Sequence, residues 1–137
     1  MNADEFFKND LFAVQSGIVL LESGEGYSKA KLDIEPRHLN AAGRTQGGAI
    51  FTLADLALAA AANSHGTLAF SLSSTISYLR ASGVGDTLYA EVRERYVGRS
   101  TGHYQVDITN QRGELIATFE SNVFRMGEPL PISKTTL

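Results

Sequence analysis

The chain contains no cysteine among its 137 residues. This absence excludes disulfide bridges, cysteine nucleophiles and thiolate zinc sites. A domain of this length buries roughly 65–70% of the surface that its unfolded chain exposes, so it can form a core without cross-links. We therefore expect a single domain over residues 1–137.

An excess of positive charge is also missing. The net charge is −3 and the pI is about 5.6, whereas nucleic-acid-binding domains usually have a net basic surface. The first ten residues are polar and acidic, without the basic start and apolar core of a signal peptide. We expect a cytoplasmic protein that binds no nucleic acid.

Several common catalytic signatures are absent. The chain has no P-loop and no Gly-x-Ser-x-Gly elbow, and residues 83–85 lack the third glycine of a dinucleotide-binding turn. His38, His65 and His103 do not have the spacing of metal ligands. We expect neither a cofactor nor a metal.

The longest weakly charged stretch covers residues 45–64, where Asp55 is the only ionisable side chain. It is rich in alanine and interrupted by polar residues, so it falls short of the roughly 20 predominantly apolar residues of a membrane span. An apolar surface on nearly all sides predicts a buried helix over residues 48–63. Thr45 is the expected N-terminal cap and Gly66 the expected stop.

The segments around this helix alternate apolar and polar residues with the period of a β-strand. Before the helix we expect a short helix, two strands and a loop, over residues 3–10, 14–22, 30–34 and 36–44. Four strands joined by short turns follow, and short turns make neighbouring strands antiparallel. The order predicts an α+β fold in which one curved antiparallel sheet of about six strands wraps a long central helix. Residues 127–137 are expected to form a loose tail.

Asp55 is the most informative residue, because an ionised carboxylate is costly to bury without a partner. Burial would raise its pKa and make it a usable general base near neutral pH. The alternative is a structural aspartate that caps a backbone or pairs with an arginine across an interface.

Gly47 and Gly48 stand at the start of the helix, where free N–H groups and the positive end of the dipole are exposed. Glycine allows close approach to the backbone, and such amides can form an oxyanion hole. The alternative is ordinary turn geometry at a helix entry. Gln46, just before the glycines, could contact the substrate or be only a polar entry residue.

Gly47 and Asp55 are eight residues apart, which is about 12 Å along a helix. To act together, both must lie within about 3–4 Å of the same carbonyl or its water. One straight helix cannot achieve this, but two antiparallel helices related by a two-fold axis can. If both residues act together, the enzyme is at least a dimer with shared sites.

Other polar residues are weaker candidates. Asn40 could hold a water or contact the aspartate, but an Asx turn is the commoner role of a loop asparagine. Arg80 could bind phosphates or belong to a salt-bridged surface. One expected strand carries a hydroxyl face that could orient a water or a substrate chain, or simply face solvent; its members are Ser71, Ser73, Thr75 and Ser77.

The residues His38-Leu39-Asn40 and the segment from Gln46 to Asp55 resemble the signature of the hotdog-fold acyl-CoA thioesterases, in their PaaI-like (phenylacetic-acid-degradation) branch. Supporting matches lie at residues 76–80, 85–88 and 98–102, and the resemblance covers about residues 8–126. It implies a hotdog fold and homodimers, commonly paired into tetramers, whose active sites are shared between subunits.

The resemblance also implies roles for individual residues. The catalytic carboxylate falls on Asp55, the thioester-polarising amide on Gly47 and the loop asparagine on Asn40. The water-positioning hydroxyl falls on Ser71, with Ser73 as the other candidate. Gln46 replaces the usual histidine; it can donate a hydrogen bond but cannot carry a proton.

The expected function is hydrolysis of aryl- or short- to medium-chain acyl-CoA, with Asp55 as general base or nucleophile. A hotdog hydratase or a non-catalytic acyl-CoA-binding protein are the alternatives. Gly48, Ser73 and Arg80 are the expected substrate-binding residues.

Overall fold

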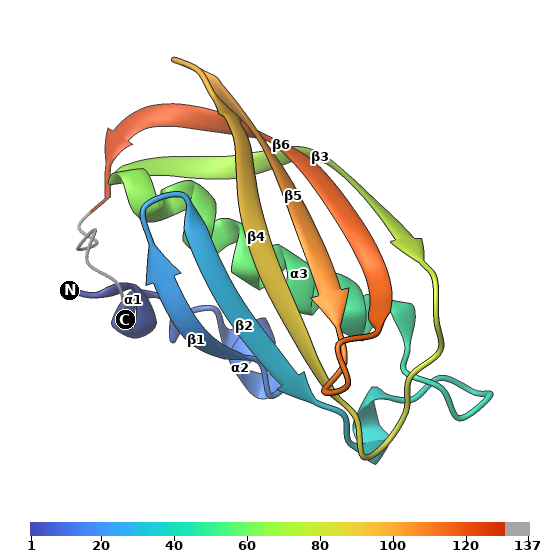
Figure 1. The fold of residues 1–137 in the computed structure, drawn as a ribbon. Coiled ribbons are helices and arrows are strands. Elements are labelled where there is room, and N and C mark those ends of the chain that lie inside the picture. The colour runs from blue at the N-terminus through green and yellow to red at the C-terminus, as the bar shows by residue number, and fades with distance from the viewer. Residues whose placement is uncertain (131–137) are drawn as a thin grey trace.

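The computed structural model of the protein describes residues 1–130 (Figure 1). Two short helices open the chain and two strands follow: α1 (Ala3–Phe7), α2 (Leu11–Gln15), β1 (Val19–Gly24) and β2 (Tyr27–Asp33). A short 3-10 turn, η1 (Pro36–His38), precedes the long helix α3 (Gly47–Ala62), which ends in a second turn, η2 (Asn63–His65). The remaining strands are β3 (Thr67–Tyr78), β4 (Thr87–Val97), β5 (Thr101–Thr109) and β6 (Leu115–Pro129).

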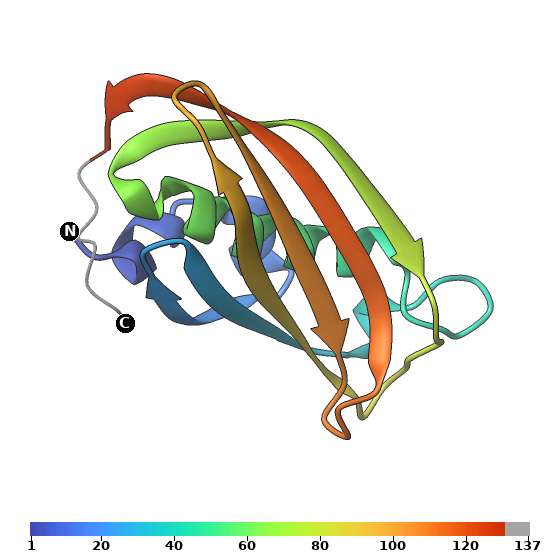
Figure 2. The ribbon, with the colours of Figure 1, turned by 45° about the horizontal axis from the view of Figure 1, so that its top comes forward.

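All six strands form one antiparallel sheet in the order β1-β2-β4-β5-β6-β3. The sheet curves around α3, which contacts every strand (Figure 2). The expected hotdog architecture, a long helix wrapped by a six-stranded sheet, is therefore confirmed. Strands β1 and β3 form the two edges of the sheet.

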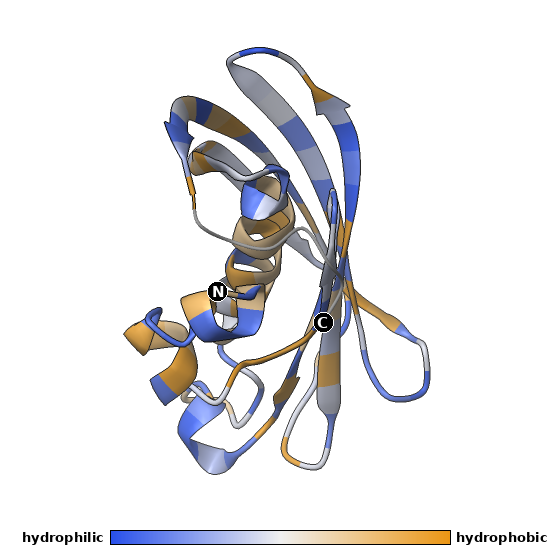
Figure 3. Ribbon diagram, turned by 90° about the vertical axis from the view of Figure 1, so that its left-hand side faces the viewer, coloured by the Kyte–Doolittle hydropathy of each residue, from blue (hydrophilic) through white to orange (hydrophobic). Residues whose placement is uncertain are grey.

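The core lies between α3 and the concave face of the sheet (Figure 3). Leu53, Ala57 and Leu58 of the helix are fully buried there, as are inward residues of the strands such as Leu88 and Val106. One stripe of α3 is left uncovered by the sheet, and it recurs at the three- and four-residue spacing of a helix face. Its members are Gly48, Thr52, Asp55 and Ala59.

The helix α3 continued through η2, Gly47–His65, is long and apolar enough by composition to cross a membrane. Most of its surface is buried inside the protein, which is the ordinary situation of a core helix. Gly66 ends the segment in the left-handed region at φ +82°, as the sequence predicts for a helix stop.

Three expectations about local structure were wrong. Residues 14–18 are not strand, because the Asp10 side chain accepts the Ala13 N–H and begins α2 at Leu11. Thr45 is not the cap of α3; its hydroxyl accepts a hydrogen bond from the buried Ser82 hydroxyl, and Gln46 caps the helix. Residues 127–129 belong to β6 and reach back to pair with the start of β3, whereas the rest of the expected tail, residues 131–137, lies outside the described residues.

Candidate active site

The entry to α3 is held by hydrogen bonds on both sides of its first residues. The Gln46 backbone N–H donates to the carbonyl oxygen of His38 at 2.7 Å. Its side-chain Oε1 accepts a hydrogen bond from the Gly48 N–H, one of the amides that a helix start leaves without an intrahelical partner. Within residues 1–130 the Gly47 N–H has no hydrogen-bond acceptor. The Gly47 amide is thus available at the positive end of the helix.

Tyr78, at the end of β3, closes over the same helix start. Its hydroxyl donates to the Gly47 carbonyl oxygen at 2.9 Å. A Cβ atom on Gly47 would lie 2.9 Å from the tyrosine ring, so glycine is required for this contact. Sequence reasoning missed this residue, because nothing local links it to a glycine 31 positions earlier.

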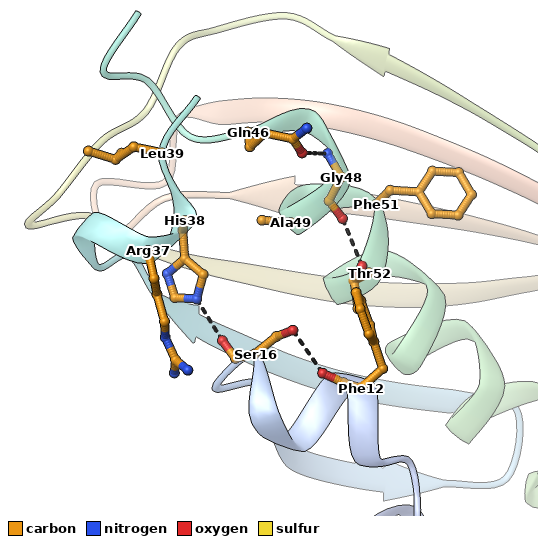
Figure 4. A pocket seen from close by; sticks show the side chains of 10 residues that line it. All are labelled: Phe12, Ser16, Arg37, His38, Leu39, Gln46, Gly48, Ala49, Phe51 and Thr52. Carbon is orange, nitrogen blue, oxygen red and sulfur yellow. Dashed lines mark hydrogen bonds between the residues drawn. The ribbon is translucent and has the colours of Figure 1, made fainter. Parts of the chain in front are cut away.

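Two hollows flank the helix start. The first, of about 450 Å³, brings Asn40, Gly47, Tyr78 and Arg80 to one wall. The second, of about 460 Å³, lies on the other side against α2 (Figure 4). Its lining is Phe12, Ser16, Arg37, His38, Leu39, Gln46, Gly48, Ala49, Phe51 and Thr52. The start of α3 therefore forms the wall between two cavities, each large enough for part of an organic ligand.

Asp55 lies on the open stripe of α3, beyond the residues that line the two hollows. It is not enclosed in the single chain, contrary to the expectation of a buried carboxylate, because the sheet covers the opposite side of the helix. Partial burial among its neighbours nevertheless raises the pKa of the Asp55 carboxyl, and the negative charge of Asp10 raises it further. The carboxylate is thus open to a ligand, and its pKa is shifted in the direction that favours a general base.

Asn40 organises the loop before the helix. Its side-chain Oδ1 accepts the N–H groups of Ala42 and Arg44, at 2.9 and 3.1 Å. This is the Asx-turn role that the sequence left open as the alternative. Asn40 also lines the hollow beside Gly47.

The hydroxyl face expected on one strand is broken by a β-bulge at Leu72. Ser71 pairs with Val123, which is buried, whereas Ser73 pairs with Asn122, which is exposed. Opposed residues of two strands share a face of the sheet, so Ser71 lies on the side of α3 and Ser73 on the outer side. Ser73 there accepts a hydrogen bond from the Asn122 amide at 3.2 Å.

Arg80 is the charged residue of the hollow beside Gly47. Its guanidinium forms an ion pair with Glu114 at 3.2 Å, and more than half of its side chain stays exposed. A surface ion pair of this kind contributes little stability, so it leaves the cation free to contact a ligand anion.

The three histidines are all engaged in contacts with the protein. His38 accepts the Glu35 N–H through Nδ1 and contacts the Ser16 carbonyl through Nε2, so its neutral tautomer is fixed. His65 lies between two glutamates, and His103 contacts the Asn122 side chain. Within residues 1–130, no three carboxylates or imidazoles gather as metal ligands would.

The edge strand β3 pairs with β6 on one side only, so its other side exposes backbone N–H and C=O groups together with apolar side chains. Phe70, Leu72 and Tyr78 are more than half exposed on it, with Leu72 at 63%. Long apolar edges usually pair with another strand. The edge therefore provides a surface on which a second strand can add.

Comparison with known proteins gives consistent matches. Residues 42–117 match the family model of the thioesterase superfamily. The chain is 36% identical over 126 residues to the acyl-coenzyme A thioesterase PaaI of Escherichia coli K12, covering 92% of this chain and 90% of that protein.

Solved structures agree with this similarity. The structure of the E. coli PaaI protein from the phenylacetic acid degradation operon superposes with a TM-score of 0.90 at 35% identity, covering 94% of each chain. A hypothetical thioesterase protein of Streptococcus pneumoniae, solved with coenzyme A, superposes with a TM-score of 0.83 at 28% identity over 90% of this chain and 98% of that one.

Proposed function

Since the chain belongs to the thioesterase superfamily, we propose that it hydrolyses acyl-CoA thioesters to the free acid and CoA, with Asp55 as the catalytic carboxylate. The observation that carries this proposal is that α3 holds a hydrogen-bond donor and a carboxylate at two separate positions. The unpaired N–H of Gly47 lies at its positive end, and a carboxylate of raised pKa lies on its open stripe.

In the proposed reaction, the thioester carbonyl docks against the Gly47 N–H, and the Gln46 side-chain amide donates a second hydrogen bond. Asp55 takes a proton from a water, and the resulting hydroxide adds to the carbonyl carbon. The two donors stabilise the oxyanion that forms. The C–S bond then breaks, and the CoA thiolate leaves and takes up a proton.

A second route starts with direct attack of the Asp55 carboxylate on the carbonyl carbon, which expels the thiolate and gives a mixed anhydride. Water then opens the anhydride. Single turnover in ¹⁸O water separates the two routes. Label in the Asp55 carboxylate supports an anhydride that water opens at the Asp55 carbonyl. Label confined to the released acid excludes that path and is the result expected of the general base.

The active form is proposed to be a homodimer that pairs into a homotetramer. Asp55 and Gly47 cannot reach the same carbonyl from one helix, and the uncovered stripe of α3 and the apolar edge of β3 offer surfaces for a second copy. A second α3 running antiparallel would place its Asp55 near the first copy's Gly47. Ser71, on the helix side of β3, and Asn40 are proposed to hold the attacking water.

The proposed substrate has two ends of different chemistry. The hollow against α2 is lined by the apolar side chains Phe12, Leu39 and Ala49, which suit an aryl or a short to medium aliphatic acyl group. Gly48 and Arg80 are proposed to contact the CoA portion. The coenzyme A in the pneumococcal relative's structure supports this class of substrate.

A hydratase is a weaker proposal, because such an enzyme of this fold uses a histidine with an acid, and both nitrogens of His38 already have protein partners. A non-catalytic acyl-CoA-binding protein would leave the raised pKa of Asp55 without a use. Thiol release from a panel of aryl- and alkanoyl-CoA thioesters tests the proposal. Release supports a thioesterase, and tight binding without release supports the binding protein.

A further inference from the structure

A continuous chain of hydrogen bonds links Tyr78 to the side chain of Gln46. The Tyr78 hydroxyl donates to the carbonyl oxygen of Gly47, which belongs to the peptide group between Gly47 and Gly48. The N–H of that same peptide group, on Gly48, donates to Oε1 of Gln46 (Figure 4). The remaining end of the chain is the Nε2 amide of Gln46.

The direction of these hydrogen bonds fixes the orientation of the glutamine amide. A backbone N–H can only donate, so the Gln46 atom that faces Gly48 must be the carbonyl oxygen. The other atom of the amide is then Nε2 (Figure 4), and within residues 1–130 it donates no hydrogen bond. Both of its hydrogens are left for a ligand.

Each link of the chain strengthens the next. A donor on the carbonyl of a peptide withdraws electron density and makes its N–H a better donor, and the same holds for a side-chain amide. The hydroxyl of Tyr78 thereby polarises the peptide between the glycines, which in turn polarises the Gln46 amide and makes Nε2 a stronger donor.

The hydrogen-bonded side chains of Tyr78 and Gln46 leave no room for a side chain at Gly47 or Gly48. A Cβ on Gly47 would lie 2.9 Å from the Tyr78 hydroxyl, and a Cβ on Gly48 would lie 2.6 Å from Gln46 Oε1. Either methyl group would push one member of the chain out of place, since real contacts of a Cβ are longer. Both positions therefore require glycine to make room for Tyr78 and Gln46, whether or not a ligand also approaches the backbone there.

We propose that Tyr78 is a positioning residue which, through the peptide between Gly47 and Gly48, orients and polarises the Gln46 amide as the second donor to the thioester oxygen. This inference rests on the proposed function. It also assigns a role to the glutamine that replaces the histidine of related enzymes. The Gln46 amide has no titrating proton, and the hydrogen bonds from Tyr78 to Gly47 and from Gly48 to Gln46 hold it in the orientation of a donor.

Tyr78→Phe is the first test, because it keeps the ring against Gly47 and removes only the hydroxyl. We expect kcat to fall about three- to tenfold while KM changes less than about twofold, since the lost polarisation matters most when the oxyanion forms. The pH profile should keep its shape, because no titrating group of the reaction is removed. Tyr96→Phe, which removes the hydroxyl of another exposed tyrosine, is the matched control and should leave kcat unchanged.

A double-mutant cycle separates this role from general support of the helix start. Gln46→Glu keeps an acceptor for the Gly48 N–H but has no amide donor. If Tyr78 acts through that donor, Tyr78→Phe should cause no further loss of kcat in the Gln46→Glu background. Equal losses in both backgrounds, or a wild-type kcat in Tyr78→Phe, would overturn the proposal.

An NMR measurement keeps the test independent of activity. The Gly48 amide proton should move upfield in Tyr78→Phe, because its hydrogen bond to Gln46 Oε1 weakens and a weaker hydrogen bond shields the proton. If the wild type hydrolyses no thioester, the proposed function fails, while this shift still reports on the hydrogen-bond chain. Unchanged resonances in a folded variant would refute the chain itself.

Discussion

Gly47 and Asp55 lie on the same helix, α3, with about 12 Å between them along its axis. A carbonyl that accepts a hydrogen bond from the Gly47 N–H is therefore out of reach of the Asp55 carboxylate of the same chain. The residues can act on one thioester only if they come from two subunits. The proposed chemistry and the proposed dimer thus depend on each other.

Mixing two inactive variants tests this dependence. One variant is Asp55→Asn, and the other is Gly47→Val, whose side chain collides with Tyr78 and blocks the amide. In a heterodimer one site has both defects and the other has neither, so a randomised equimolar mixture should recover about a quarter of wild-type activity. The measurement is thiol release after subunit exchange. A mixture as inactive as its components, with heterodimers demonstrated by mass, would contradict shared sites.

Asp10 should shift the acid limb of the pH–rate profile, beside the larger effect of the partial burial of Asp55. Its negative charge contributes to the raised pKa of Asp55, so Asp10→Asn should lower that pKa and move the acid limb of kcat to lower pH. Asparagine is as good a helix cap as aspartate, so α2 should remain folded. Profiles of kcat against pH for both proteins give the answer. A limb that stays in place would show that Asp10 does not raise the pKa of the group that titrates in kcat.

Asp55 should cost the protein stability at neutral pH. Because the folded-state pKa is raised, the folded protein binds the proton more tightly than the unfolded chain does, and stability falls as pH rises from the ordinary aspartate value through the raised one. Asp55→Asn removes this cost, so we expect its Tm to exceed that of the wild type at pH 7. At about pH 3 the carboxyl is neutral in both states and the difference should vanish. Thermal unfolding at the two pH values measures this difference, and a lower Tm of the variant at pH 7 would contradict a raised pKa of Asp55 in the folded protein.

Much of the fold could be predicted because its patterns are local. The apolar helix around Asp55 and the period-2 strands that follow it are visible in the sequence, and their order leaves few ways to cover the helix. The prediction was wrong where β-branched residues competed with a cap. Val14 and Ile18 suggested a strand, but the Asp10 side chain begins a short helix there. An acidic cap before Leu11 was the signal that could have corrected it.

The site was less predictable, because its contacts join distant segments. Asn40 was recognised, but only the folded loop shows that its oxygen is used by Ala42 and Arg44. The bulge that separates Ser71 from Ser73 depends on the register of β3 against β6, which no local pattern specifies. Tyr78 could not be assigned a role at all, because its partner lies across the fold.

Thiol release by wild type and Asp55→Asn from a panel of aryl- and alkanoyl-CoA thioesters is the decisive measurement of whether Asp55 catalyses thioester hydrolysis. Asp107→Asn, an aspartate of β5 that pairs with Arg93, is the matched control and should behave like wild type. We predict hydrolysis by the wild type and a loss of at least about 100-fold in kcat for a folded Asp55→Asn protein. No hydrolysis of any thioester by the wild type, or equal rates in wild type and Asp55→Asn, would contradict the account.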